Sequence, residues 1–260
     1  MDNGKLDRLL EVMGLLRSKD GCPWDREQTH ESLKKYLIEE TYEFLEVVDL
    51  NDKKRMCDEL GDVLLQVVFH SQIAEENGDF NIEDVINGIC EKMIHRHPHV
   101  FGDVSVKNSN EVLKNWEEIK KKEKGSIDHT SVLQDVPINL PALMRSFKVQ
   151  QKAAQVGFDW DNPSDVFAKI REEIDELEAE YKKSDKSGME DELGDVLFSV
   201  VNLSRFLKVH PELSLSQATN KFIRRFEYIE RRALELGKKL NEMTLVEMDV
   251  LWSEAKIKKT

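Results

Sequence analysis

The chain has 260 residues, 40% of them hydrophobic and 34% charged, which is enough for one large domain or two modest domains with their own cores. Its net charge of −13 argues against nonspecific binding to nucleic acid or to an anionic membrane, and no apolar run approaches the ~20 residues that span a bilayer. Three widely spaced cysteines, and a start without an apolar signal core, favour a reducing cytoplasm.

The first half of the chain predicts helices separated by short turns. Apolar residues with a helical period run from Leu6 to Leu16, and residues 22–25 are expected in a loop. We expect residues 97–103 not to be helical, because Pro98 lacks a backbone donor and restricts its neighbour. The other helices are expected over residues 31–48, from a cap at Asp52 to Gly78, over 81–95, and over a short stretch from Ser109.

A charged segment separates the two halves of the chain. Lys120 to Lys124, followed by Gly125 and Ser126, is typical of a linker, and prolines follow at positions 137 and 141. We therefore predict one domain over residues 1–124, a linker over 125–140, and a second domain over 141–260.

The second half predicts the same plan. A helix is expected over residues 142–155, then a loop over 158–161, an acidic helix from Pro163, and a polar turn over 182–188. Ser187, Ser214 and Thr244 each open a sequence typical of a capping box. Apolar residues recur at spacings of three and four, so no strand is predicted. The expected fold class is all-α, with two tandem helical-bundle domains of about four or five helices each.

One acidic motif occurs twice, and every position is offset by the same 133 residues. Each copy reads E-E-x-x-E, a gap, and then E-L-G-D. Positions three and four apart share one helix face, and a short turn lets two helices pack antiparallel. Each copy is therefore expected to bring its acids face to face. The first copy has Glu39, Glu40, Glu43, Glu59 and Asp62, and the second has Glu172, Glu173, Glu176, Glu192 and Asp195.

Clustered carboxylates repel one another and raise each other's pKa, so a bound divalent cation would stabilise them. Magnesium is the natural candidate, because it prefers carboxylate oxygens and water. The alternative is an acidic helix face that is simply solvated. Two copies with identical spacing, beside apolar residues such as Leu193 and Val196, favour the metal site.

Several polar and aromatic residues could bind a nucleotide. Asn202 shares a helix face with Asp195 and could hydrogen-bond a base or sugar, although it could equally be a half-exposed polar residue. Trp252 and Lys256, four residues apart, could stack a base and hold a phosphate, as could Trp116 and Lys120 in the first half. Such basic residues could also be ordinary surface charges, and such tryptophans core residues. The basic segments Lys221–Arg225 and Lys92–Arg96 suit polyphosphate oxygens.

Other classes of protein fit the sequence less well. It has no G-x-x-x-x-G-K-[ST] or G-x-G-x-x-G loop, and paired E-x-x-H motifs, which would indicate a di-iron bundle, are absent. Two rival hypotheses stay open. One is a nucleotide-binding helical sensor or scaffold without catalysis, and the other is a carboxylate-bridged redox-metal protein.

The duplicated E-E-x-x-E and E-x-x-D signature resembles the MazG family of nucleoside triphosphate pyrophosphohydrolases. The resemblance covers nearly the whole chain. It includes the Cys22-Pro23-Trp24-Asp25 loop, residues 96–101, residues 152–160, and residues 245–252. It implies an all-α pyrophosphatase fold that assembles as a homodimer, and magnesium-dependent hydrolysis of NTPs or dNTPs to the monophosphate and pyrophosphate, in a house-cleaning role.

The resemblance also implies roles for residues. The second repeat is expected to be the main catalytic one, because activity in two-domain members is usually ascribed to it. Its metal ligands would be Glu173, Glu176, Glu192 and Asp195, with Mn²⁺ as a possible substitute for Mg²⁺. Glu172, turned by about 100° around the helix, is the candidate general base. The matching first-repeat acids are Glu40, Glu43, Glu59 and Asp62, with Glu39 in addition. Lys152, Lys221, Arg225 and Lys256 are the candidates for phosphate, Trp252 for the base, and Asn202 for a base or sugar contact.

Overall fold

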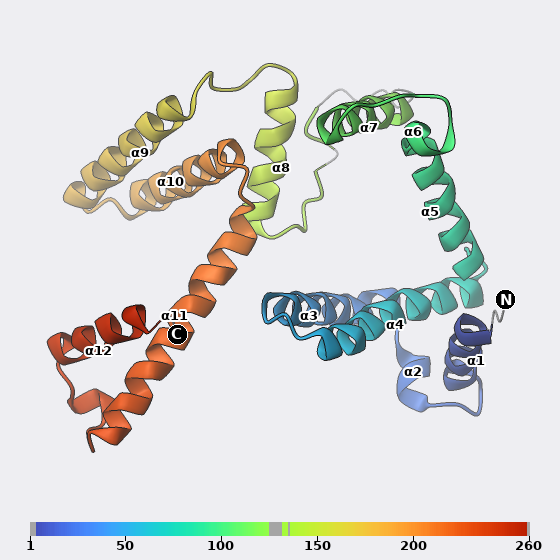
Figure 1. Cartoon of the computed structure of the whole chain (residues 1–260), viewed down its shortest axis with the longest axis horizontal. Coiled ribbons are helices and arrows are strands. Elements are labelled where there is room, and N and C mark those ends of the chain that lie inside the picture. Colours follow the sequence, from blue (N-terminus) through green and yellow to red (C-terminus); the bar gives the residue numbers. More distant parts are fainter. Residues whose placement is uncertain (1–3, 125–131, 135, 259–260) are drawn as a thin grey trace. The chain divides into compact units, whose positions relative to one another are not determined.

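The computed structural model describes residues 4–124, 132–134 and 136–258. Over these residues the chain forms helices and turns and no strand, which confirms the all-α prediction. The chain divides into two compact units, residues 1–127 and 128–260 (Figure 1). No helix among the described residues is both long and apolar enough to cross a membrane.

The first unit is centred on a long helical hairpin. α3 and α4 pack against each other along their length, and α1 lies against α4. The core between these three helices contains Met13, Leu33 and Phe69, each of them almost fully buried. The helices of this unit are α1 (Gly4–Arg17), α2 (Pro23–Glu27), α3 (His30–Asp49), α4 (Lys53–Asn77), α5 (Ile82–Arg96), α6 (Pro98–Phe101) and α7 (Ser109–Lys124).

The second unit repeats the hairpin and adds a separate helix pair. α9 packs along α10, α8 lies against both α10 and α11, and α12 packs on α11. An apolar cluster around Ile229, Ala233 and Leu251 joins α11 to α12. The elements of this unit are α8 (Ala142–Gln155), α9 (Pro163–Lys183), α10 (Lys186–Phe206), α11 (Pro211–Glu235), the 3-10 helix η1 (Leu240–Glu242) and α12 (Leu245–Ile257).

Two proline-led segments are helical where the sequence analysis expected none. α2 starts at Pro23, in the segment that was expected to be a loop, and α6 starts at Pro98. In both, proline occupies the first turn, where its missing N–H would have no helical partner and its fixed φ suits the helix. The prediction that residues 97–103 are not helical was therefore wrong at Pro98, which begins a helix rather than interrupting one. With these two short helices, residues 4–124 of the first unit contain seven helices, above the expected four or five.

The expectation that the charged run from Lys120 to Lys124 is linker was wrong, whereas the predicted linker bounds of 125–140 begin after this run and stay a prediction. Lys120 to Lys124 belong to α7, which runs four turns from Ser109, because lysine and glutamate are good helix formers. The expected linker residues 125–131 lie outside the described residues.

Of the three predicted capping boxes, only the one at Thr244 is confirmed. The turn between α9 and α10 is shorter than expected, and Asp185 caps α10 by accepting from the backbone amides of Ser187 and Gly188. α11 begins at Pro211, so Ser214 lies inside its first turn. In both cases a better start signal lies just upstream, an aspartate or a proline at the first helical position.

Candidate active site

The α9–α10 hairpin brings three predicted metal ligands of the second repeat together. Glu173 comes from α9, and Glu192 and Asp195 come from α10. One carboxylate oxygen from each lies within 4.8 Å of the others. Glu173 is almost fully buried, whereas Asp195 is exposed. Two oxygens on opposite sides of a magnesium ion would be about 4.2 Å apart, so a small divalent cation fits this set.

The α3–α4 hairpin forms a comparable group in the first repeat. Glu40 and Glu43 on α3 and Glu59 on α4 each offer an oxygen within 4.8 Å of the other two. Six of the eight predicted metal ligands therefore meet in two groups. The exceptions are Glu176 and Asp62, which lie outside these groups and still act on them electrostatically.

One acid in each repeat has a raised pKa, as expected where carboxylates cluster. The pKa of Glu176 is raised by desolvation, then by its hydrogen bond to Glu173 and by the charges of Glu173 and Glu192. The pKa of Glu40 is raised by desolvation and then by the negative charge of Asp62 and its neighbours. This repulsion is what a bound cation would relieve.

A lysine lies beside the second group. Lys169 Nζ is 2.7 Å from Glu173 Oε1 and 2.9 Å from Glu172 Oε1, and the two contacts raise the pKa of this lysine above its usual range. Lys169 is therefore a fixed cation that offsets part of the acidic charge. Glu172, the candidate general base, is exposed and is held by this lysine outside the three-acid group.

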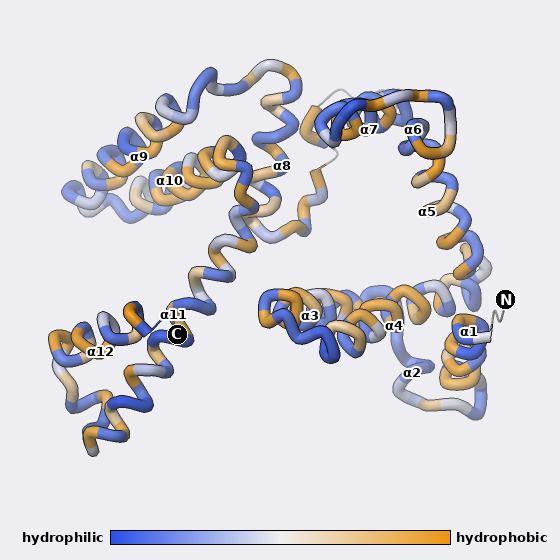
Figure 2. The backbone as a smooth tube through the Cα atoms, in the orientation of Figure 1, coloured by the Kyte–Doolittle hydropathy of each residue, from blue (hydrophilic) through white to orange (hydrophobic). Residues whose placement is uncertain are grey.

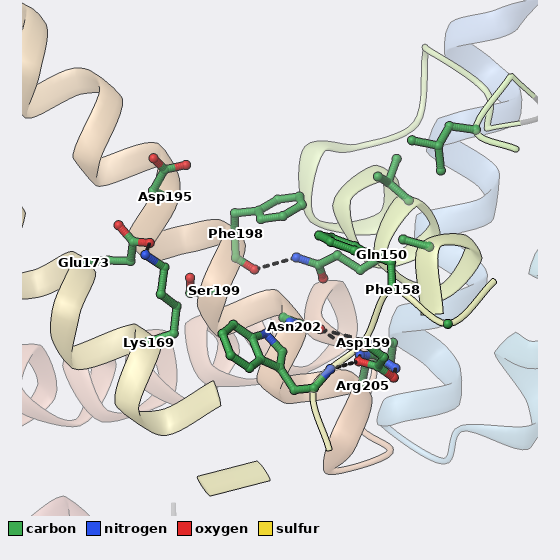
Figure 3. Close-up of a pocket in the computed structure, with 15 residues that line it drawn as sticks. Gln150, Phe158, Asp159, Lys169, Glu173, Asp195, Phe198, Ser199, Asn202 and Arg205 are labelled. Atoms are coloured by element: carbon green, nitrogen blue, oxygen red, sulfur yellow. Dashed lines mark hydrogen bonds and ion pairs between the residues drawn. The ribbon is translucent and has the colours of Figure 1, made fainter. Parts of the chain in front are cut away.

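A cavity of about 550 Å³ opens beside the acids of the second repeat. Glu173, Asp195 and Lys169 line one side of it, and apolar and aromatic side chains from α8 and from the segment before α9 line the other (Figure 3). Its volume is in the range of small-molecule sites. Ser199 and Asn202, one and two turns after Asp195 on α10, also line it, which confirms that these three residues share a face.

An ion pair supports the wall of this cavity opposite the acids. Arg205 Nη1 donates to Asp159 Oδ2 at 2.8 Å, and Arg205 Nη2 donates to Asn202 Oδ1 at 3.0 Å. The hydrogen bond from Arg205 holds the pKa of Asp159 below its usual range. Because Arg205 occupies the amide oxygen of Asn202, the amide NH₂ is the group that Asn202 can offer to a ligand.

The structure does not bring the predicted phosphate residues to the cavity within one chain. Lys221, Arg225, Trp252 and Lys256 lie on α11 and α12, and Lys152 lies near the end of α8; none of them lines it. Arg225, rather than Lys256, lies over the indole of Trp252, with its Cζ 5.5 Å from the ring centroid. Trp252 packs against the apolar cluster of α11 and α12, as a core residue would.

Among the cavity residues that the sequence analysis did not predict as site residues are Gln150, Lys169 and Arg205. Lys169 precedes Glu173 by four positions, so helix spacing could have indicated it. Arg205 likewise follows Asn202 by three. Gln150 gives no local signal, because its place depends on how α8 packs against α10.

Comparison with known proteins agrees with this geometry. The MazG nucleotide pyrophosphohydrolase domain matches residues 28–101 and 162–230, which contain the two acidic hairpins. A nucleoside triphosphate pyrophosphohydrolase/pyrophosphatase MazG of Thermotoga maritima is 49% identical over 96% of this chain and 95% of its own length. A nucleoside triphosphate pyrophosphohydrolase of Escherichia coli K12 is 44% identical, with 97% of both chains covered.

A third relative has no assigned function. YabN of Bacillus subtilis, an uncharacterized protein, is 52% identical over 93% of this chain, which corresponds to 49% of YabN. Two domain matches at the two acidic repeats, and full-length relatives well above 30% identity, identify the family: the chain belongs to the MazG nucleotide pyrophosphohydrolases.

Proposed function

We propose that the chain is a magnesium-dependent nucleoside triphosphate pyrophosphohydrolase that controls the nucleotide pool. It would hydrolyse NTPs or dNTPs with one water to the monophosphate and pyrophosphate. The observation that carries the proposal is the position of Glu173 and Asp195, which form one side of a cavity large enough for a nucleotide. The names of the relatives from Thermotoga maritima and Escherichia coli support the same reaction.

The acids of the second repeat are proposed to hold the metal. Glu173, Glu176, Glu192 and Asp195 offer carboxylate oxygens from two facing helices, a donor set that suits Mg²⁺ and, as a substitute, Mn²⁺. A bound ion would supply positive charge to the triphosphate and lower the pKa of a coordinated water. The hairpin fixes the carboxylates before substrate arrives, so little reorganisation is needed.

Other residues of the second repeat are proposed to bind substrate and move a proton. Glu172 is the candidate general base, and Lys169, its ion-pair partner, would hold it in position. Asn202 would donate its amide NH₂ to the sugar or base. Lys152, Lys221, Arg225 and Lys256 as phosphate contacts, and Trp252 as a base contact, stay predictions.

The second repeat is proposed as the main catalytic one, within domain boundaries of 1–124 and 141–260. The first repeat would bind metal through Glu40, Glu43, Glu59 and Asp62, with Glu39 exposed beside them. Two positions that line the cavity in the second repeat are occupied in the first by the aromatic residues Tyr36 and Phe69, and both pack into its core.

We also propose that the protein is a cytoplasmic homodimer. Both α10 and α4 are rich in apolar residues (Figure 2), and on each helix a stripe of three of them, at matching positions with spacings of four and three, is exposed. A stripe of this kind on an amphipathic helix needs a partner surface. Sedimentation analysis tests the dimer, and Leu197→Glu is expected to give a monomer. The stripe residues are Leu193, Leu197 and Val200 on α10, and Leu60, Leu64 and Val67 on α4.

The proposed reaction is tested with the full chain, Mg²⁺ and the eight common NTPs and dNTPs. We expect release of pyrophosphate and monophosphate in equal amounts, with no release after chelation of the metal. Binding of nucleotide without pyrophosphate release would support the sensor hypothesis instead. Release of single phosphates would show cleavage at another bond and would contradict the proposed reaction.

A further inference from the structure

The cavity beside the acids contains a buried hydrogen-bond acceptor to which no group in the described part of the chain donates. Gln150, on α8, is 7% exposed, and its Nε2 donates to the backbone oxygen of Phe198 at 2.8 Å. Its Oε1 is buried and has no hydrogen-bond partner among the residues that the structure describes. A carbonyl oxygen can only accept, so the Phe198 contact fixes which end of the amide faces α10 and turns Oε1 away from it.

A buried acceptor of this kind is costly to leave unpaired and is therefore a sign of a ligand contact. An unsatisfied buried polar group loses the hydrogen bond that it would have made with water. Gln150 is a lining residue of the cavity, and its amide lies on the side away from the acids (Figure 3). A ligand that enters the cavity with a hydrogen-bond donor would therefore give Gln150 Oε1 its partner.

The surroundings of Gln150 suit a flat aromatic group. The rings of Phe158, Trp160 and Phe198 line the same cavity, and all three are exposed in the free protein. Exposed aromatic rings beside a cavity can stack on a nucleobase, which has a π-face whatever its identity. Stacking alone would not distinguish bases, so discrimination would come from the amide.

We propose that Gln150 is the base-reading residue of the enzyme. Its Oε1 would accept a hydrogen bond from the exocyclic amino group of a base stacked among these rings, while the triphosphate lies toward Glu173 and Asp195. This inference rests on the proposed function and places the base in the cavity rather than over Trp252.

The chemistry of the bases predicts a direction of preference. The amino group of cytosine or adenine projects a donor at an acceptor such as Oε1. Uracil and thymine carry a carbonyl oxygen at the ring position where cytosine carries its amino group, and this oxygen would face Oε1 as a like dipole. The preference is therefore for amino-bearing bases over uracil and thymine.

The test pairs a change in the protein with a change in the base. Hydrolysis of ATP is compared with that of purine riboside triphosphate, which lacks only the amino group, and CTP is compared with UTP. For the wild-type chain we expect kcat/KM to favour the amino-bearing nucleotide by roughly tenfold. Gln150→Met keeps the size of the side chain and removes the acceptor, and should bring both ratios close to one.

A neighbouring glutamine provides the control. Gln151 follows on the same helix and is exposed, so Gln151→Met should keep the wild-type ratios. Wild-type ratios near one, or ratios in Gln150→Met equal to those of wild type, would overturn the proposal. The wild-type ratio decides the matter even where the variant does not fold.

Binding separates this inference from the reaction. Calorimetry with the α,β-methylene analogues of CTP and UTP reports base preference without hydrolysis. Pyrophosphate release with no base preference would remove the role of Gln150 alone. A preference in binding with no pyrophosphate release would remove the proposed reaction and keep the base site.

Discussion

The two repeats carry the same acids in the same helical register, but the residues that follow those acids differ. On α10, Asp195 is followed along its face by Ser199 and Asn202, and all three line the cavity. On α4 the position that corresponds to Asn202 is Phe69, which is 3% exposed and belongs to the core of the first unit. The same helix position thus lines the cavity with a polar side chain in the second repeat and belongs to the apolar core in the first.

The helix before the turn shows the same contrast. Lys169 on α9 contacts Glu173 and lines the cavity. Its counterpart on α3 is Tyr36, which packs against the core of the first unit. The residues one or two turns from the acids thus differ in place between the repeats: in the second they line the cavity, and in the first they pack into the core.

The largest expected difference between the repeats is in catalysis. Glu192→Gln should lower kcat on the order of 100-fold or more, because it removes a charged ligand from the group next to the cavity. Glu59→Gln, the matching change in the first repeat, should lower it by less than about fivefold. Pyrophosphate release from the preferred nucleotide measures both.

An exposed acid on the same helix provides the control for this pair. Glu190→Gln lies outside the three-acid group and should keep wild-type activity. Equal losses in Glu192→Gln and Glu59→Gln would show that both repeats are needed for turnover. The prediction that the second repeat is the main catalytic one would then be wrong.

Asn202 and Phe69 occupy matching positions of the two repeats. Exchanging their residue types should weaken substrate binding in the second unit and destabilise the first. Asn202→Phe would fill the cavity and is expected to raise KM by roughly tenfold or more. Phe69→Asn would leave a void and a buried amide in the first unit, at a cost of about 3 kcal/mol in the free energy of unfolding.

Two measurements check this exchange. KM of each variant is compared with wild type, and urea unfolding gives the free energy. A normal KM for Asn202→Phe would mean that substrate binds elsewhere, and an unchanged unfolding midpoint for Phe69→Asn would mean that this position is not part of the core.

Local sequence rules predicted the parts of the fold that depend on neighbours along one helix. The spacing of the acids gave both hairpins, and Asp52, Gly78 and Thr244 mark helix ends where the sequence placed them. The rules failed where two start signals competed, as Asp185 did with Ser187, since spacing does not rank them. They also failed where proline begins a helix rather than breaking one.

The site was predictable only as far as one hairpin extends. Glu173 meets Glu192 and Asp195 because a short turn joins their helices. The lining from α8, including Gln150, depends on packing between helices far apart in sequence, for which no periodicity exists. Trp252 and Lys256 share a helix as predicted, yet the cation that lies over the indole is Arg225 from α11.

Replacing Lys169, which lies beside the acids of the second repeat, is expected to have a smaller effect, on the affinity for metal. Lys169→Met would remove the cation that lies beside Glu173, so the acids should repel more strongly and bind Mg²⁺ more tightly. We expect millimolar Mg²⁺ to raise the melting temperature by a few degrees more in this variant than in wild type. Lys182→Met, at an exposed position on the same helix, should behave as wild type. A smaller shift in Lys169→Met would show that the lysine helps to hold the metal or its ligands.

The smallest effect concerns a histidine pair that occurs in the first repeat alone. His30 Nδ1 and His70 Nδ1 are 2.7 Å apart, with the rings stacked, whereas the positions that match them by the repeat offset are Pro163 and Leu203. Desolvation, and then the charge of His30, lower the pKa of His70 below its usual 6.5.

Because the folded state binds this proton less readily than the unfolded state, stability is full above pH 6.5 and falls as the pH drops toward the lowered pKa. Melting curves between pH 7.5 and pH 5.5 should therefore show a loss of about a degree in wild type that His70→Leu reduces. The same slope in both proteins would assign the acid sensitivity to groups other than His70, and not to the clustered carboxylates, whose raised pKa changes stability in the opposite direction.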